Sequence, residues 1–257
     1  MIALSAGIVL SAAAGHAADL APAMAPMPEP VQTPEGWKFS FAPYFWASGL
    51  SGKSANFGLP TIDVHESFGD ILSDLDFAFM AAGDARYGPY SIMTDLSYAR
   101  VTTDAGTPRG VVASRVGLKT ETFTAFLGGG YSILDDGVGR LDVVGGARIW
   151  YVDTKVSFQG GLLGGVSRAD SATWVDGMVG LRGMYSITPN FYLTGWGMIG
   201  TGGADIDWDV MGGLGYKFNE KVSAIAGYRA LGVDYHNESL TYDMIQHGPM
   251  LGVVLRF

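Results

Sequence analysis

The chain has 257 residues, no cysteine, a formal net charge of −9 and only 16% charged residues. The lack of cysteine excludes a disulfide framework and a thiolate metal site. The acidic balance argues against nucleic acid as a partner, because phosphates would repel such a surface. Glycine is frequent, with 38 residues, and mean hydropathy is +0.21. After the N-terminal region, no apolar run reaches the roughly 18 residues of a membrane helix, which favours one β domain with alternating side chains.

Residues 1–17 are predicted to be a secretory signal peptide. Met1–Ala14 is almost wholly small or apolar, and Gly15-His16-Ala17 resembles a small-residue cleavage site. No Lys or Arg precedes the apolar run, and the first basic residue is Lys38, so we expect the true start codon to lie upstream. Residues 18–36 are rich in proline and are predicted to form an extended periplasmic linker.

Residues 37–257 are predicted to form a closed, antiparallel, up-and-down transmembrane β-barrel, an all-β fold. Apolar and mixed side chains alternate with a period of two between turn signals. Short and long connections also alternate, as in outer-membrane barrels with short periplasmic turns and longer extracellular loops. We predict about ten strands, with eight as the alternative. The strands cover residues 37–50, 75–87, 90–102, 117–132, 140–155, 172–187, 190–201, 207–218, 221–234 and 242–257.

Two prolines interrupt this pattern, Pro43 in the first strand and Pro249 in the last. A closed barrel has no free edge where a missing N–H can face solvent, so we expect a bulge or a local break at each proline. Both strands lie at the seam where the barrel closes. The long, extracellular loops are expected at residues 51–74, 103–116, 156–171, 202–206 and 235–241.

The charged residues of the predicted strands lie on the face opposite the apolar one. Isolated Asp and Arg residues among Gly indicate a packed, self-neutralising lumen, while the apolar face meets lipid and ends in aromatic residues. We expect Arg148 to pair with Asp142 or Asp176, and Arg229 to pair with Asp209 or with the acidic neighbours of Lys217. The predicted lumen charge network comprises Asp76, Asp84, Arg86, Asp95, Asp142, Arg148, Asp176, Arg182, Asp209, Lys217, Arg229 and Arg256.

The last ten residues, 248–257, show the alternation clearly. Leu251, Val253 and Leu255 share one face, and the chain given ends on Phe257. A final strand with an apolar face and a terminal aromatic is typical of bacterial outer-membrane barrels.

Several segments resemble a widespread family of small proteobacterial outer-membrane β-barrel proteins, and the resemblance covers nearly all of the chain after the linker. It implies the fold, a location in the bacterial outer membrane, and contact with outer-membrane lipid and lipopolysaccharide. It also implies that Phe257 is an assembly signal for the barrel-insertion machinery, but no particular activity or oligomeric state. Met198 departs from the acidic lumen residue expected in the seventh strand. The segments are Trp37–Trp46, Ser67–Leu72, Gly145–Trp150, Trp174–Arg182, Gly227–Arg229 and Gly248–Phe257.

Two histidines, His65 and His236, lie among acidic residues in predicted loops. Omptin proteases and lipid A acylases place histidine near acidic or serine residues at the outer rim. Catalysis needs a base within hydrogen-bond reach of a nucleophile, with an orienting acid behind the base. Nearness along a loop does not supply that geometry, so solvated histidines are favoured and no catalytic residue is assigned. The neighbours are Asp63, Glu66 and Asp70 for His65, and Asp234, Glu238 and Ser239 for His236.

The run Asp205-Ile-Asp207-Trp-Asp209 suggests a calcium site, because hard cations take several carboxylates. It lacks the spacing and the glycine of an EF-hand loop. We therefore expect a rim cluster that faces solvent or lipopolysaccharide counter-ions, and we predict no metal and no cofactor.

The sequence thus predicts a non-enzymatic outer-membrane barrel with a structural or surface-interaction role. Side chains fill the interior of a barrel of this size, which excludes a wide porin and leaves a narrow pore as an option. The alternative is an outer-membrane enzyme that acts on lipid or peptide at the extracellular rim. A soluble lipocalin-like barrel is a third option, which an apolar outer face and a packed polar interior would exclude.

Deletion of Phe257 is expected to lower the amount of assembled barrel in cells more than it lowers stability. One buried aromatic contributes about 1.5–3 kcal/mol, which a folded barrel survives, whereas failed recognition by the insertion machinery prevents assembly. Heat-modifiable gel mobility of outer-membrane fractions measures assembly, with refolding into detergent as the control. Normal assembly in cells would exclude the signal role, and poor refolding in detergent would indicate a stability effect.

Overall fold

The computed structural model describes residues 36–55, 62–106, 115–162, 164–237 and 240–257. The predicted signal peptide, residues 1–17, and residues 18–35 of the predicted linker lie outside the described residues. Within the described part of the chain, no helix is long and apolar enough to cross a bilayer.

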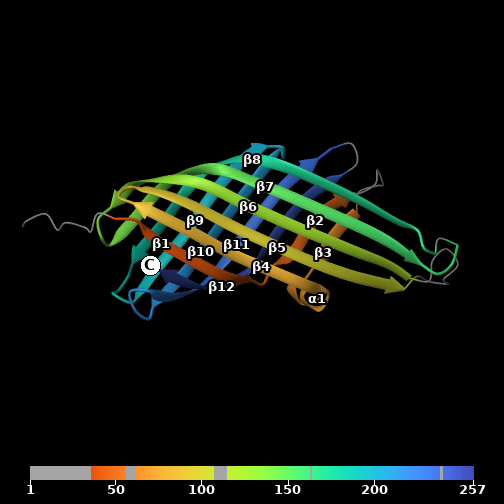
Figure 1. Ribbon diagram of the computed structural model, residues 1–257, viewed down its shortest axis with the longest axis horizontal. Coiled ribbons are helices and arrows are strands. Elements are labelled where there is room, and N and C mark those ends of the chain that lie inside the picture. The colour runs from red at the N-terminus through yellow and green to blue at the C-terminus, as the bar shows by residue number, and fades with distance from the viewer. Residues whose placement is uncertain (1–35, 56–61, 107–114, 163, 238–239) are drawn as a thin grey trace, which may run out of the picture. The chain divides into compact units, whose positions relative to one another are not determined.

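Twelve strand segments form one antiparallel sheet that closes into a ten-stranded barrel (Figure 1). β1 and β2 count as one barrel strand because both pair with β12. β3 and β4 form the next strand, since they pair with β2 and β1. The predicted fold class is confirmed. The segments are β1 (Lys38–Trp46), β2 (Gly49–Ala55), β3 (Ile62–Glu66), β4 (Leu75–Tyr87), β5 (Tyr90–Gly106), β6 (Arg115–Asp135), β7 (Gly139–Gln159), β8 (Ser167–Ser186), β9 (Phe191–Gly202), β10 (Ile206–Lys217), β11 (Val222–His236) and β12 (Thr241–Arg256).

One side of the barrel wall is much taller than the other. β6 and β7 have 21 residues each and β8 has 20, whereas β9 and β10 have 12 each. A tilted strand crosses a bilayer with about 9–11 residues, so β5–β8 project beyond the membrane at the end opposite the short turns (Figure 1). We call this projecting wall the ridge. It comprises residues 100–106, 115–121, 153–159 and 167–171, much of which the sequence predicted as loop.

The predicted loop at residues 51–74 contains regular structure instead, so this loop prediction was wrong. β2 and β3 pair as a hairpin, and the short helix α1 (Phe68–Ser73) connects β3 to β4. The helix begins with a capping box in which Ser67 Oγ accepts from the Asp70 N–H and the Ser67 N–H donates to Asp70 Oδ2 at 3.1 Å. These bonds hold the pKa of Asp70 below its usual range. The Ser67–Asp70 spacing was the signal that could have predicted the helix start.

The two prolines coincide with breaks in the pairing at the closure seam. β1 and β2 follow one register along β12, and the break between them lies at residues 47–48, opposite Gly248 and Pro249. The Ala47 N–H donates to the Pro249 carbonyl at 2.9 Å, and Pro249 has no N–H to complete the ladder. A Cβ on Gly248 would overlap the Ala47 carbonyl, so this close approach requires glycine. Near Pro43 the pairing with β12 is also interrupted, again without a register shift.

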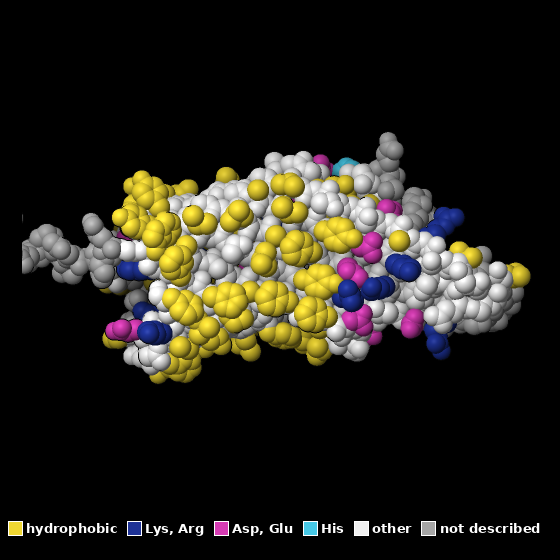
Figure 2. Space-filling model, viewed as in Figure 1, with side chains coloured by type: hydrophobic (Ala, Val, Ile, Leu, Met, Phe, Trp, Pro, Cys, Tyr) yellow, Lys and Arg dark blue, Asp and Glu magenta, His cyan; other side chains and the backbone are white. Residues whose placement is uncertain are grey.

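Exposed apolar side chains cover the outside of the barrel wall, and on the face shown in Figure 2 they form a band. Leu127, Val179 and Leu251 are each more than 60% exposed and face outward. Aromatic side chains border the band toward the short turns, for example Tyr90 and Tyr131, whose ring centroids are 5.4 Å apart. A soluble protein would aggregate through such a surface, whereas in a bilayer it is the lipid-facing belt. The soluble-barrel alternative is therefore excluded.

Close packing inside the barrel predicts different effects for two glycines of β10. The Tyr192 ring lies over Gly215 in the lumen and its hydroxyl is 3.0 Å from Ser223 Oγ, whereas Gly212 faces outward into open space. Gly215→Ala should lower the free energy of unfolding by about 1–3 kcal/mol, because the added methyl overlaps the ring. The matched control Gly212→Ala should leave it nearly unchanged. Urea titration followed by heat-modifiable gel mobility measures both, and equal effects would contradict this packing.

Candidate functional site

The lumen is built in layers because inward-facing residues of neighbouring strands pair in register. On β7 and β8 every second residue points inward and is buried or half-buried. The register aligns these residues across the two strands. Charged side chains of both strands therefore lie at one height, and apolar or aromatic side chains lie at another. From the periplasmic end upward, the aligned pairs are Asp142 with Arg182, Val144 with Gly180, Gly146 with Met178, Arg148 with Asp176, and Trp150 with Trp174.

The lower charged layer is a balanced network of two guanidinium groups and two carboxylates. Arg86 lies 2.7 Å from Asp84 and 3.0 Å from Asp142. Arg182 contacts the same two carboxylates, at 2.8 and 3.1 Å. The Ser132 hydroxyl donates to Asp142 at 2.6 Å. Each cation thus bridges both anions, as buried charges require.

An apolar layer separates this network from the next one. It consists of five buried side chains, three of them methionines, which suit an irregular space because the thioether chain is flexible. Met198 belongs to this layer, which explains why the seventh strand carries no acidic residue at that position. The five residues are Met93, Phe126, Val144, Met178 and Met198.

The upper charged layer is held by two arginines that reach across the lumen. Arg148 Nη1 lies 2.6 Å from Asp207 and its Nη2 lies 2.7 Å from Asp209. Arg229 Nη2 lies 2.7 Å from Asp209 and 2.9 Å from Asp95. Both arginine side chains are 2% exposed. Asp209 therefore joins the two arginines in the middle of the barrel.

Aromatic donors satisfy the remaining carboxylate oxygens of this layer. The Trp150 indole N–H donates to Asp207 at 2.8 Å, and the Trp196 indole donates to Asp209 at 3.0 Å. The Tyr44 hydroxyl donates to Asp95 at 3.0 Å and accepts from Arg229 at 2.7 Å. Charge-assisted bonds of this kind are the strong ones in an interior of low dielectric constant.

The predicted pairing of Arg148 was wrong, and so was the predicted exposure of Asp207 and Asp209, whereas Asp205 is exposed at the rim as expected. Arg148 pairs with neither Asp142 nor Asp176, because its long side chain crosses the lumen to β10 instead of following the wall. Asp207 and Asp209 are fully buried, since alternation along β10 turns both inward. That alternation was visible in the sequence and could have added Asp207 to the network. Arg229 does contact Asp209, as expected.

Asp176 occupies a different position from the other carboxylates. It is fully buried opposite Arg148 in register, yet it forms no ion pair within the described part of the chain. Its Oδ1 accepts from the Ala204 N–H at 2.8 Å, while Oδ2 has no hydrogen-bond partner among the described residues. With Asp176 included, the upper layer holds four carboxylates for two guanidinium groups, so it carries excess negative charge.

The other predicted network members lie at the two ends. Lys217 Nζ is 5.5 Å from the Tyr192 ring centre, and Arg256 donates to the Tyr192 hydroxyl at 3.5 Å, so both form the floor of the lumen. Asp76 is exposed and accepts from Thr102 Oγ1 at 2.7 Å. Asp76 is thus outside the lumen network, because β4 is irregular between Leu75 and Phe77 at the rim.

Phe257 lies at the closure seam. Its N–H donates to the Phe39 carbonyl at 2.9 Å, and its ring is exposed at the periplasmic end of the barrel. This position suits an interface aromatic.

Stacked aromatic rings cover the upper network toward the outside. The Trp150 and Trp174 ring centroids are 5.6 Å apart and nearly parallel. Tyr235 stacks on Trp174 at 4.0 Å, and Tyr242 packs against both tryptophans. This aromatic layer completes the filling of the lumen.

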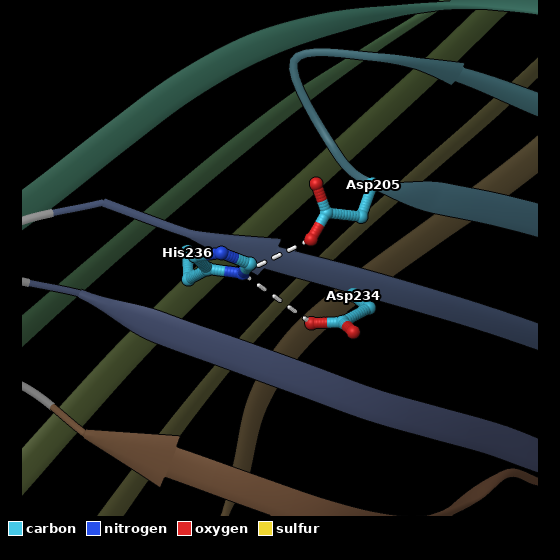
Figure 3. Close-up of side chains that lie close together, drawn as sticks. All are labelled: Asp205, Asp234 and His236. Carbon is cyan, nitrogen blue, oxygen red and sulfur yellow. Dashed lines mark ion pairs between the residues drawn. The ribbon is translucent and has the colours of Figure 1, made fainter.

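The rim carries a second cluster, formed by Asp205, Asp234 and His236 (Figure 3). His236 Nδ1 lies 3.3 Å from Asp205 and 3.8 Å from Asp234, and all three side chains are more than 40% exposed. Their ligand atoms lie within 4.8 Å of one another, so the group could hold a metal ion. Glu238 and Ser239, the other expected neighbours, lie outside the described residues. Exposed pairs of this kind interact weakly.

His65 does not join this rim cluster. It lies on β3, opposite Ser51, and its side chain is exposed. The acid nearest in sequence, Glu66, is opposite Leu50. The two histidines singled out from the sequence are therefore on separate strands, and the structure brings Asp205 to His236 only.

Comparisons with known proteins show the fold. No family model matches the chain, and no curated protein sequence matches it. The chain is similar to the crystal structure of the outer membrane protease OmpT from Escherichia coli, with a TM-score of 0.56 and 11% identity, over 89% of this chain and 99% of that one. It is also similar to the translocator domain of the autotransporter NalP from Neisseria meningitidis, with a TM-score of 0.51 and 14% identity, over 88% and 90%.

The closed wall, the lipid-facing belt and these likenesses define the class of protein. It is an integral β-barrel protein of the bacterial outer membrane. Likeness at this level of identity shows the fold and carries no activity from either relative.

The charge imbalance of the upper layer predicts opposite outcomes for two Asp→Asn substitutions. Asp209→Asn removes the carboxylate that Arg148 and Arg229 share, and should cost about 3–5 kcal/mol, as breaking a buried ion pair does. Asp176→Asn removes a buried charge without an ion-pair partner and keeps an acceptor for Ala204, so stability should stay the same or rise. Urea unfolding of refolded barrels measures both. An Asp176→Asn variant as unstable as Asp209→Asn would contradict the imbalance.

Proposed function

We propose that the protein is a non-conducting outer-membrane barrel that acts at the cell surface through its ridge. The observation that carries this proposal is the layered filling of the lumen. Two charged layers, an apolar layer between them and an aromatic layer above leave the inward side chains of these layers buried or half-buried.

The chemistry of the layers opposes the passage of ions. A permeating ion would have to separate Arg148 and Arg229 from their carboxylates, and an unpaired buried charge costs several kcal/mol. It would then meet the apolar layer around Met178 and Phe126, and hydrophobic constrictions of this kind block conduction by excluding water. The narrow pore that the sequence left open is therefore disfavoured in this proposal.

The ridge supports the surface role. β6 and β7 pair without interruption from Arg115 opposite Gln159 down to Gly130 opposite Val144, so the projecting part is a continuous ladder. At about 3.3 Å per residue, the ridge residues 115–121 and 153–159 extend roughly 20 Å along each strand. Such a wall exceeds what membrane insertion requires, and it presents two faces to the outside of the cell.

Planar-bilayer recording tests the closed lumen. The wild-type barrel should give no stepwise currents. A variant with Arg148→Ser, Trp150→Ala and Arg229→Ser, refolded and checked by heat-modifiable mobility, should conduct, because it removes the cross-lumen bridges and part of the aromatic layer. Stepwise, ion-selective currents from the wild-type barrel would overturn the proposal and favour the narrow pore.

A second candidate function is an enzyme at the rim, favoured by the 3.3 Å contact between His236 and Asp205. An imidazole oriented by a carboxylate is the arrangement that a general base uses. Hydrolysis of a peptide library and of phospholipid by the refolded protein tests this candidate, with His236→Ala as the variant and His65→Ala as the matched control. Activity lost only in the His236 variant would replace the first proposal.

A further inference from the structure

We propose that the outer face of the ridge, just above the lipid belt, binds the phosphate groups of lipid A, the membrane anchor of lipopolysaccharide. This inference depends on the location of the barrel in the outer membrane and on the ridge. It does not depend on whether the lumen is closed.

An aromatic row marks the upper border of the lipid belt on this side of the barrel. Tyr98, Phe123 and Tyr151 lie directly opposite one another across β5, β6 and β7. Below them on β6 the outward residues are apolar, including the exposed Leu127. Aromatic rings of this kind lie at the level where acyl chains meet headgroups.

Two rows of charged residues follow directly above the aromatic row. Two residues further along each strand, Arg100, Glu121 and Asp153 lie opposite one another. Two residues beyond that row, Lys119 lies directly opposite Lys155. At about 3.3 Å per residue along tilted strands, these rows lie roughly 5–13 Å beyond the aromatic border, which is the headgroup region. Figure 2 shows basic and acidic side chains gathered at this edge of the apolar band.

The two lysines form a pair that an anion would stabilise. Like charges directly opposite each other on neighbouring strands are destabilising. Lys119 is partly compensated, because its Nζ lies 2.8 Å from Glu121, but Arg100 shares the same carboxylate at 3.1 Å. Lys155 has no carboxylate within 4.0 Å among the described residues, and its side chain is exposed. A phosphate between the two ammonium groups would relieve this repulsion.

The charge and position of the patch point to an anchored phosphate. The upper row holds two cations and no carboxylate on β6 and β7, on a chain whose net charge is −9, and Asp76 of β4, which accepts from Thr102 Oγ1, borders this row on the β5 side. Arg100 and Lys119 are each 40% exposed and accessible from the membrane side. Lipid A combines acyl chains, which would lie along the belt, with phosphates at the height of the lysines. A soluble anion would contact the lysines but not the lipid belt.

Thermal unfolding of the refolded barrel in detergent tests the inference, with lipid A carrying two phosphates as the probe. Lipid A should raise the unfolding temperature of the wild-type barrel, because a ligand of the folded state stabilises it. Lys119→Ala combined with Lys155→Ala should weaken the apparent affinity about tenfold or more. Lys221→Ala, in the turn at the opposite end, is the matched control and should respond like the wild type.

The Lys155→Glu variant separates binding from folding. It places an acid opposite Lys119, so the lipid-free barrel should be at least as stable as the wild type, while the response to lipid A should be lost. An unchanged response of either lysine variant would overturn the inference. So would an equal effect of fully dephosphorylated lipid A, which would mean acyl-chain binding only, or of inorganic phosphate at the same concentration, which would mean a free-anion site. The unfolding experiment does not measure conductance, so the result of the lipid A test is independent of the result of the planar-bilayer test.

Discussion

The structure depends on one physical constraint, the pairing of charges inside a closed wall. A barrel in a membrane gains little from burying its outer face, because that face meets lipid as apolar as itself. Specific contacts across the lumen must therefore fix the positions of the strands around the barrel axis. Arg148 on β7 and Arg229 on β11 both bind Asp209 on β10, and Arg229 also reaches Asp95 on β5. The Asp209 carboxylate thus connects distant parts of the wall. Its loss should therefore lower the free energy of unfolding more than the loss of the Asp176 carboxylate does.

The period of two explains what the sequence could predict. A strand has only two faces, so the side to which a residue points follows from counting, and the inward direction of Arg148, Arg182 and Arg229 could be predicted without coordinates. The partner of each arginine could not. It depends on strand tilt and on how far a side chain reaches across the lumen, and neither leaves a local pattern. Arg148 was therefore paired with wall neighbours in the prediction, and Asp207 was placed at the rim although it is fully buried.

The ridge escaped prediction for a related reason. Above the membrane the outer face of β5–β8 no longer meets lipid, so polar residues replace the apolar ones on that face, and residues such as Asp104 and Ser157 look like loop. Helix α1 was missed because it has six residues, too few for helical periodicity, and only its capping box signals it. Because the wall is taller on one side than on the other, the lysine pair and the histidine cluster lie on different sides of the barrel. The two lysines lie on the tall side, while His236 lies where β9 and β10 are short.

A filled, charged lumen also specifies which face of every strand points inward. Replacing a buried ion pair with apolar residues is often neutral for stability, so the pairs alone do not explain why the lumen is charged. Shifting a strand by one residue, however, would turn its arginine toward the lipid. Each such arginine costs about 2–4 kcal/mol at the bilayer midplane, and Arg86, Arg148, Arg182 and Arg229 stand on four different strands. The charged layers therefore act mainly against wrong registers. Lumen glycines, such as Gly215 beneath Tyr192, leave room for large neighbouring side chains to lie flat against the wall. In the correct register these side chains fill the lumen.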